Sequence, residues 1–214
     1  MHTLILCIET ATDVCSVCLA KNDEPIAIAE EITPNSHARL LAPMIQQTLH
    51  KADVHIQQLG AVCVSMGPGS YTGLRIGFAL AKAICYAQNI PMITVSTLHS
   101  IAYGIRPHAA GHAVLLPALD AKRDDAYFCI LSNNIEELHP PACKSVSYIH
   151  EWLREKNLSA IAGGPGAHKL KSIDLPIQIL TNPVVSARFL APLAYAKFHS
   201  NEFSHTAYCE PLYL

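Results

Sequence analysis

Hydrophobic and polar positions divide the first half of the chain into short strands and two helices. Strands are predicted at 3–8, 14–20, 26–32, 61–65 and 91–95. Helices are predicted at 37–52 and 72–89, where apolar residues recur at helical spacing. Polar turns between the first three strands indicate an antiparallel meander, and the strand–helix–strand order that follows indicates a mixed sheet with helices against it. The sequence therefore predicts an α/β domain over about residues 1–105.

The second half of the chain has shorter and less regular elements. Strands are predicted at 114–119, 126–131 and 160–162, and helices at 147–156 and 186–200. A charged turn at 120–125 joins the first two strands, and a glycine turn at 163–166 follows the third. We expect a second, smaller α/β domain over residues 106–214.

The helix predicted at 72–89 is apolar on almost every side. Small residues recur every four positions in two rows on nearly opposite sides, Gly73, Gly77 and Ala81 in one and Ala79, Ala83 and Ala87 in the other. The sheet covers one side, and the helix at 37–52, a second protein chain or both cover the other. We expect a partner to dock on the two helices, at Leu40, Leu41, Met44, Ile45, Gly73, Arg75, Gly77, Leu80, Ala81 and Ile84.

Composition narrows the classes of function. Half of the 214 residues are hydrophobic, 15% are charged, and the formal net charge is -2 without a run of lysine or arginine. A protein that grips nucleic acid alone usually has a basic surface, so we expect any contact with RNA to be indirect. The apolar run at 4–8 is too short for a signal peptide or a membrane span, which favours a cytoplasmic protein without membrane contact.

Cysteine and histidine patterns do not indicate a metal site. Most of the eight cysteines lie in apolar stretches, which favours buried, reduced thiols. Cys15 and Cys18 form a C-x-x-C string, but this spacing in a strand puts the two thiols on opposite faces. His108 and His112 form an H-x-x-x-H string among proline and glycine residues, where a loop does not align the two rings.

The segment from Gly67 to Gly73 is the sharpest local signal. A glycine-rich turn before a helix can hold phosphate on its backbone N–H groups. However, the spacing fits neither a P-loop, nor a dinucleotide-binding turn, nor a hydrolase nucleophile at Ser70. The sequence favours a structural turn in which Ser70 or Thr72 caps the helix. Turns are likewise the simpler interpretation of 163–166 and of 120–125.

Several strings resemble the TsaB (YeaZ) family across nearly the whole chain. They lie at 5–12 with 15–17, 36–45, 67–77, 120–127 and 210–214, and the string at 67–77 is the most specific. The resemblance implies an actin-like ATPase (ribonuclease H-like) fold with two related domains, the second one reduced. It also implies a non-catalytic subunit that pairs with its paralogue TsaD and with the ATPase TsaE in making threonylcarbamoyladenosine beside the anticodon of tRNA. A weak homodimer is expected when the chain is alone.

The resemblance implies no catalytic, cofactor-binding or metal-binding residue in this chain, and ATP is used by the complex rather than by this subunit. Metal-ligating histidines of TsaD fall on Thr97 and Ile101, which cannot replace imidazole. Actin-like kinases carry Asp and a glycine in their first turn, whereas this chain has Glu9 and no glycine up to Val17.

Two other functions stay open. One is an ATP-dependent transferase or glycoprotease-like peptidase that works in a groove between its two domains. The candidate groove residues are Glu9, Thr10, Asp120, Lys122 and Arg123. The other is a stand-alone nucleotide-binding module, which only the glycine turns favour. Against the enzyme, the chain has no H-E-x-x-H string and no nucleophile with a base beside it.

Overall fold

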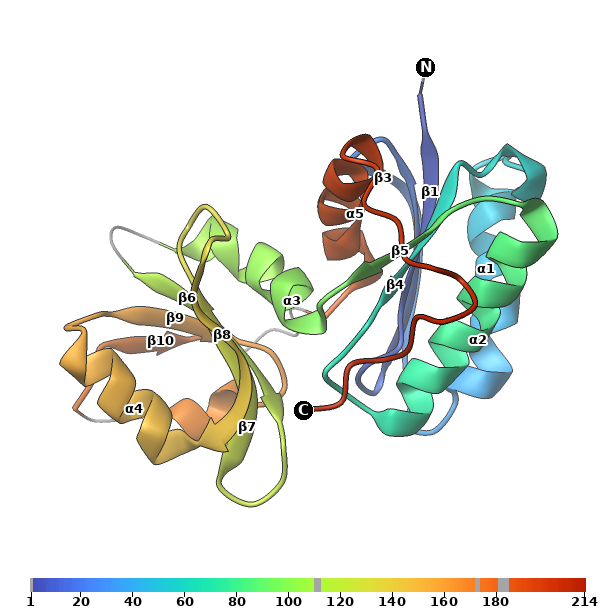
Figure 1. Cartoon of the computed structure of the whole chain (residues 1–214). Helices are drawn as coiled ribbons and strands as arrows, with labels where there is room; N and C mark the ends of the chain where they lie inside the picture. Colours follow the sequence, from blue (N-terminus) through green and yellow to red (C-terminus); the bar gives the residue numbers. More distant parts are fainter. Residues whose placement is uncertain (1, 110–112, 172–173, 181–184) are drawn as a thin grey trace. The chain divides into compact units, whose positions relative to one another are not determined.

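The computed structural model describes residues 2–109, 113–171, 174–180 and 185–214. The chain forms two compact units (Figure 1). The first contains residues 1–100 and 186–213, and the second contains residues 101–185 with Leu214. The last 28 residues up to Tyr213 thus return to the first unit, whereas the sequence suggested that the second domain runs to residue 214.

The first unit is built on a five-stranded mixed sheet. Its strands are β1 (Leu4–Glu9), β2 (Val14–Lys21), β3 (Glu24–Ile32), β4 (Ala61–Ser65) and β5 (Met92–Val95), in the order β3-β2-β1-β4-β5. The first three form the expected antiparallel meander, and β4 and β5 run parallel to β1. β1 and β4 are apolar throughout their central residues because helices cover both faces of the sheet.

Helices cover the two faces of this sheet. On one face lie α1 (His37–Lys51) and α2 (Tyr71–Gln88), side by side, and on the other lies α5 (Leu190–His199) (Figure 1). α1 is continuous through Pro43, and the left-handed Asn89 ends α2. Cys15 packs in the core beneath α1 and α2, and Cys18 packs in the core beneath α5, so the two thiols do lie on opposite faces.

The second unit repeats the same strand order with smaller parts. Its strands are β6 (Val114–Asp120), β7 (Asp125–Leu131), β8 (Glu137–Ser145), β9 (Ala160–Gly163) and β10 (Ile177–Ile179), in the order β8-β7-β6-β9-β10. β6, β7 and β8 are antiparallel neighbours, whereas β9 and β10 run parallel to β6. α4 (Val146–Glu155) and the short helix η3 (Ala167–Leu170) pack on this sheet. The repeat confirms two related domains of which the second is reduced.

Four elements have bounds or partners that the sequence did not predict. These are α3 (Thr97–Ile105), β8, β10 and the single-turn helix η4 (Ala187–Phe189) that precedes α5; the chain also has the single turns η1 (Ile56–Gln58) and η2 (Arg106–His108). β8 contains Pro140 and Pro141, which argue against a strand from sequence, but as an edge strand it needs no donor on its outer side.

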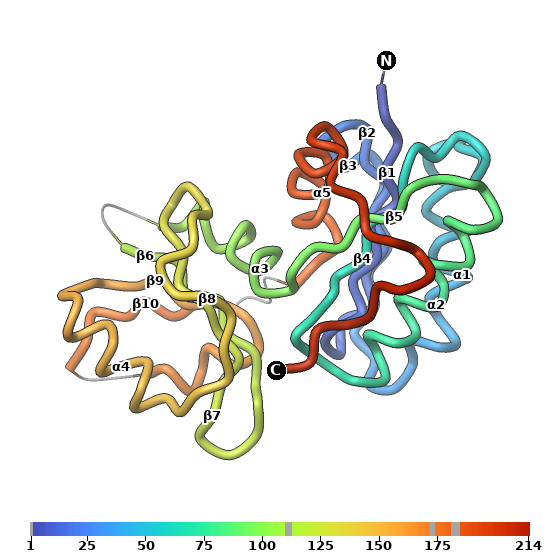
Figure 2. The backbone as a smooth tube through the Cα atoms, viewed as in Figure 1, coloured from blue at the N-terminus to red at the C-terminus, as the bar shows by residue number. Residues whose placement is uncertain are grey.

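The C-terminal segment joins the first unit because its apolar residues cover the second face of that sheet. Leu190, Ala191 and Ala194 of α5 are fully buried against β1, β4 and β5. Beyond α5 the chain passes β5 and reaches the start of α2 (Figure 2). There Ser204 N–H donates to the Met92 carbonyl at 2.8 Å and Leu212 N–H donates to the Met66 carbonyl at 2.7 Å.

Candidate functional site: strand ends and the outer helical face

Glu9, at the carboxyl end of β1, is fully buried. Its Oε1 accepts hydrogen bonds from Ala11 N–H at 2.7 Å and from Ser65 Oγ at 2.8 Å, whereas Oε2 has no partner among the described residues. Loss of water raises the pKa of Glu9 to about 7, and these hydrogen bonds only partly oppose the shift. Glu9 therefore fastens the β1–β2 turn to β4 from inside the core.

Thr10 is also fully buried, beneath the first turns of α2. A Cβ at Gly73 would collide with the Thr10 carbonyl oxygen, and one at Gly77 would collide with the Thr10 hydroxyl. These two glycines thus let α2 sit directly on the end of β1. Ser70 caps the helix as expected, accepting from Gly73 N–H at 3.2 Å. The glycine-rich turn is a packing device, and neither Glu9 nor Thr10 lines a surface.

Asp120 occupies the matching position in the second unit, at the carboxyl end of β6, and it is exposed. Lys169 Nζ donates to Asp120 Oδ1 at 2.6 Å and also to the carbonyls of Arg123 and Asp125 at 2.7 and 3.0 Å. This ammonium, followed by Lys122 N–H, lowers the pKa of Asp120. One lysine with all three protons engaged therefore fastens the charged turn, and it explains the charge density there without a ligand.

Lys122 and Arg123 are exposed and have positive φ angles of 69° and 47°. They form the tip of the turn that Lys169 fastens. The glycine turn after β9 rests on the same strand end: Gly166 N–H donates to the Ala118 carbonyl at 3.0 Å, and a Cβ on Gly166 would collide with Leu119. The five candidate groove residues thus divide into a buried pair in one unit and three exposed residues in the other.

The two positions where a metal-binding relative has histidines are filled by other contacts. Thr97 is buried and its Oγ1 accepts from Gly67 N–H at 3.2 Å, and Ile101 is a buried apolar residue that packs on Gly164. Among the described residues no group of three histidine, cysteine, aspartate or glutamate side chains is placed to hold a metal ion. His112, the second histidine of the H-x-x-x-H string, lies outside the described residues.

The outer face of α1 and α2 is where the structure corrects the predicted docking residues. Seven of the ten are buried in the first unit and offer little or no surface to a partner: Leu41, Met44, Ile45, Gly73, Gly77, Ala81 and Ile84. They face the sheet because that row carries the apolar side chains and the two glycines that close contact requires. Arg75 is exposed, and Leu40 and Leu80 are half-buried.

The second small-residue row of α2 points outward. Ala79, Ala83 and Ala87 are all exposed, so neither the sheet nor α1 covers them. The exposed residues of α1 include three with small side chains, Ala38, Ala42 and Pro43. They also include three polar ones, Arg39, Gln46 and Gln47. We call these exposed residues of α1 and α2, with Thr72, Arg75 and Tyr86, the outer helical face. It combines short side chains, such as those of Ala42, Ala79 and Ala83, with longer polar and aromatic ones on two helices that lie side by side.

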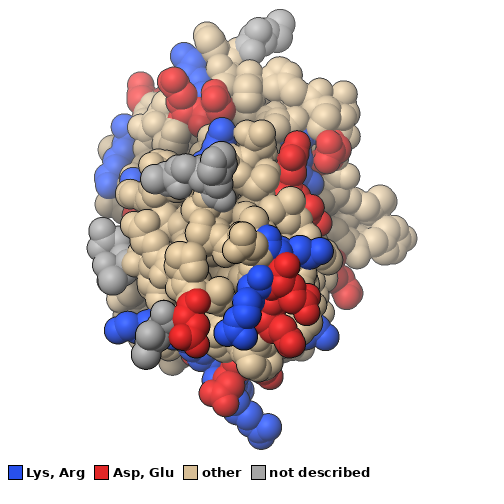
Figure 3. Space-filling view, turned by 90° about the vertical axis from the view of Figure 1, so that its left-hand side faces the viewer, with Lys and Arg blue, Asp and Glu red and all other residues tan. Residues whose placement is uncertain are grey.

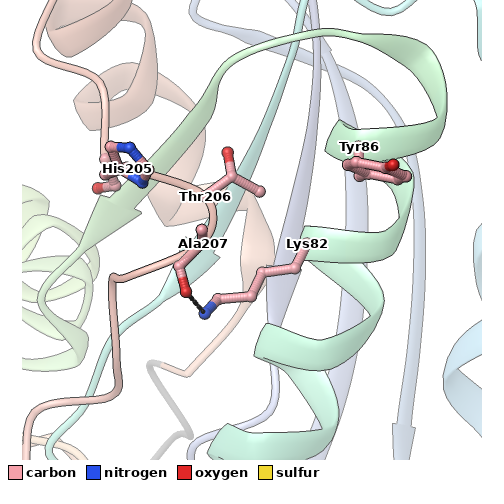
Figure 4. Close-up of a pocket in the computed structure, with 6 residues that line it drawn as sticks. Lys82, Tyr86, His205, Thr206 and Ala207 are labelled. Atoms are coloured by element: carbon pink, nitrogen blue, oxygen red, sulfur yellow. Dashed lines mark hydrogen bonds between the residues drawn. The ribbon is translucent and has the colours of Figure 1, made fainter.

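The C-terminal segment borders the outer helical face, and the sequence did not predict this contact. Arg75 Nε donates to Tyr213 OH at 3.3 Å, and its guanidinium lies 4.1 Å from the centroid of the Tyr71 ring. Further along α2, a hollow of about 560 Å³ lies between the helix and residues 204–207. Lys82 Nζ crosses it to the Ala207 carbonyl at 3.3 Å, and Tyr86 beside it is 88% exposed (Figure 4). Long-range contacts of this kind leave no local sequence pattern.

The charged side chains on one face of the molecule are of mixed sign (Figure 3). On the face seen in Figure 3, lysine and arginine side chains are interspersed with aspartate and glutamate, and no large area of one sign is visible. No helix in the described part of the chain has the length and apolar character needed to cross a membrane.

The same strand order in two mixed sheets, each with helices packed on it, defines the actin-like ATPase class of the ribonuclease H-like fold. The activator of 2-hydroxyisocaproyl-CoA dehydratase from Clostridium difficile, solved with ADPNP, is similar over 96% of this chain and 99% of its own, with a TM-score of 0.55 and 11% identity. YeaZ from Pseudomonas aeruginosa is similar over 99% of this chain and 100% of its own, with a TM-score of 0.82 and 21% identity.

Sequence comparison narrows this class to one family. The family model described as TsaD, tRNA N6-adenosine threonylcarbamoyltransferase, matches residues 26–198. The chain is 27% identical to the tRNA threonylcarbamoyladenosine biosynthesis protein TsaB of Escherichia coli K12 over 98% of this chain and 94% of that one. It is 31% identical to the protein of the same name from Bacillus subtilis 168 over 72% of this chain and 67% of that one. The chain belongs to the TsaB (YeaZ) family.

Proposed function

We propose that this chain is a non-catalytic subunit that pairs with a TsaD homologue, and through it works with a TsaE homologue, in threonylcarbamoylation of the adenosine beside the anticodon of tRNA. Support for the pathway comes from the names of its relatives, which are tRNA threonylcarbamoyladenosine biosynthesis proteins. Support for the absence of catalysis comes from the strand ends of the first unit.

The observation that carries the proposal is the burial of Glu9 and Thr10. A catalytic or phosphate-binding group must meet its substrate, and active sites are concave and accessible. At the end of β1 both side chains are fully buried, α2 sits on Thr10 through Gly73 and Gly77, and Glu9 spends its Oε1 on Ala11 and Ser65. Packing closes the end of the strand, which supports a chain that keeps the fold without a ligand site at this position.

The outer helical face supports the partner role. A stable protein–protein contact buries roughly 1,600 Å² in total. Two helices of 15 and 18 residues that lie side by side with Ala42, Ala79 and Ala83 exposed offer a long, shallow surface. Short side chains let two helix axes approach to about 8 Å, which a helix pair of the partner can use. Without that partner we expect the same face to meet its own copy in a weak symmetric homodimer.

Reconstitution tests the proposal. Purified homologues of TsaD, of TsaE and of TsaC, the enzyme that makes the threonylcarbamoyl adenylate, are supplied with tRNA, threonine, bicarbonate and ATP. The modified nucleoside is measured with and without this chain. We expect modification only when the chain is present, and none from the chain alone. Modification without the chain refutes the requirement, and ATP turnover or modification by the chain alone refutes the non-catalytic role and favours the enzyme alternative.

A further inference from the structure

We infer that the exposed edge of β3 is a docking site for an extended segment of a partner protein that carries basic side chains, which would add to the sheet as a sixth strand beside α1. The inference goes beyond the proposed function, because it concerns the edge of the sheet, which shares only Pro43 and Gln47 with the outer helical face, and it does not depend on which protein docks on that face.

The first observation is a comparison of the four sheet edges. An edge strand presents unpaired backbone groups and is normally short, interrupted by proline, or covered. β10 has three residues, β8 contains Pro140 and Pro141, and β5 is covered by the C-terminal segment, where Ser204 pairs with Met92. Each of these three edges is protected in one of the usual ways.

β3 lacks this protection over most of its length. It has nine residues, and within the described part of the chain its backbone bonds only to β2. Pro25 blocks only its beginning. Residues 26–29, which follow, are apolar, whereas Glu30 and Glu31 are charged; Ile26 and Ile32 are 45% and 63% exposed. Every second residue of an edge strand directs its N–H and C=O away from the sheet, so a row of donors and acceptors faces solvent here.

The second observation is a groove beside this edge. A hollow of about 640 Å³ lies between β3 and α1. Its apolar part is formed by Ile28, Ala29, Leu40, Pro43 and Met44, and its polar border by Glu30, Glu31, Gln47 and Lys51. A strand that pairs with β3 places alternate side chains on the α1 side of the sheet, where this groove receives them. A sheet edge next to a helix is the arrangement by which several peptide-binding domains hold an extended chain.

The charged residues of β3 indicate which kind of segment can bind at this edge. β3 carries Glu24, Glu30 and Glu31 and no basic residue, while Lys21 of β2 lies opposite Glu24 and Lys51 of α1 lines the groove. Arg188 pairs with Glu30 at 3.2 Å, but no ion pair is found for Glu24 or Glu31 in the described residues. Opposite charges directly across a strand pair are favourable and like charges are not. A second copy of this chain would bring three more carboxylates to the same seam, so the observations favour a basic segment from another protein.

The test uses three eight-residue peptides and the full chain. The first alternates lysine and valine, the second alternates glutamate and valine, and the third repeats the first with alternate amides N-methylated, which removes backbone donors and keeps the charge. Affinity is measured by fluorescence anisotropy, and hydrogen exchange locates the site. We expect the lysine peptide to bind and to protect amides of β3, and each of the other two to bind at least tenfold more weakly.

A charge reversal with a matched control completes the test. Glu31→Lys should weaken the lysine peptide at least fivefold, whereas Glu151→Lys, an exposed residue of α4 in the other unit, should change nothing. The inference is overturned if the N-methylated peptide binds equally well, if protection falls outside β3, if no lysine peptide binds at millimolar concentration, or if Glu31→Lys binds as well as the control. A concentration-dependent dimer that protects β3 would instead show a second copy as the occupant and also overturn it.

Discussion

Two acidic residues hold the same place in the two units and have opposite surroundings. Glu9 is the last residue of β1, and Asp120 is the last residue of β6. Each of these strands comes first along the chain in its own sheet, and the two sheets have the same strand order. Glu9 is buried and its pKa is raised to about 7, whereas Asp120 is exposed and Lys169 lowers its pKa. Topology thus fixes where the carboxylate lies, and the neighbouring packing decides whether it is charged.

The element after the fourth strand of each sheet explains the difference. In the first unit this element is α2, whose 18 residues press on the β1–β2 turn and exclude water from Glu9. In the second unit it is η3, whose four residues supply Lys169 and leave Asp120 open to solvent. One copy of the duplicated strand end is closed by a helix, and the other is fastened by a single ion pair.

The largest expected effect is on the pH dependence of folding through Glu9. Its pKa rises from 4.5 to about 7 on folding, so the folded chain holds the proton more tightly. The stability that protonated Glu9 contributes, on the order of 3 kcal/mol, is fully present below pH 4.5 and is lost as the pH rises through 7. Glu9→Gln cannot ionise, and its unfolding free energy should change much less between pH 5 and pH 8. Chemical denaturation at both pH values measures the unfolding free energy of the wild type and of Glu9→Gln. The same change in this free energy with pH for the two proteins would show that Glu9 stays charged.

A second substitution tests how closely α2 sits on the end of β1. Gly77→Leu places a side chain where Thr10 already lies, and overpacking of this kind costs about 1–3 kcal/mol. In a chain of this length we expect the melting temperature to fall by roughly 2–10 °C. Ala79→Leu on the exposed row of the same helix is the matched control and should melt like the wild type. Equal melting of the two variants would mean that the glycine row is not the packed one.

Asp120, the counterpart of Glu9 in the second unit, should make a smaller contribution to folding stability, with the opposite dependence on pH. Because folding lowers the pKa of Asp120, the stability that it contributes is present above the unfolded pKa and is lost as the pH falls through the folded one. Asp120→Asn keeps an acceptor for Lys169 but removes the charge, so it should lose less stability than the wild type on acidification. Lys169→Met removes all three hydrogen bonds of the turn and should increase hydrogen exchange at 120–125. Unchanged exchange there would show that the lysine does not hold the turn.

The sequence predicted the sheets and most helices because hydrophobic period and turn residues are local. It also limited the helix cap to Ser70 or Thr72, of which the structure shows Ser70, and it put Cys15 and Cys18 on opposite faces. It could not choose between the two small-residue rows of α2, because both are apolar and only the position of the sheet distinguishes them. The return of residues 186–213 to the first unit and the pairing of Tyr213 with Arg75 depend on contacts between distant segments, which leave no periodic signal.

The affinity of the purified chain for its TsaD homologue, measured by isothermal titration calorimetry with wild type and Ala83→Leu, tests the central claim most directly. Ala83 is exposed on α2, so leucine there leaves the fold and melting temperature unchanged but separates two helices that pack at short distance. We predict a tight complex with the wild type and an affinity at least tenfold weaker, about 1.4 kcal/mol, with Ala83→Leu. No complex with the wild type, or the same affinity for a correctly folded Ala83→Leu, would contradict a partner subunit that docks through its outer helical face.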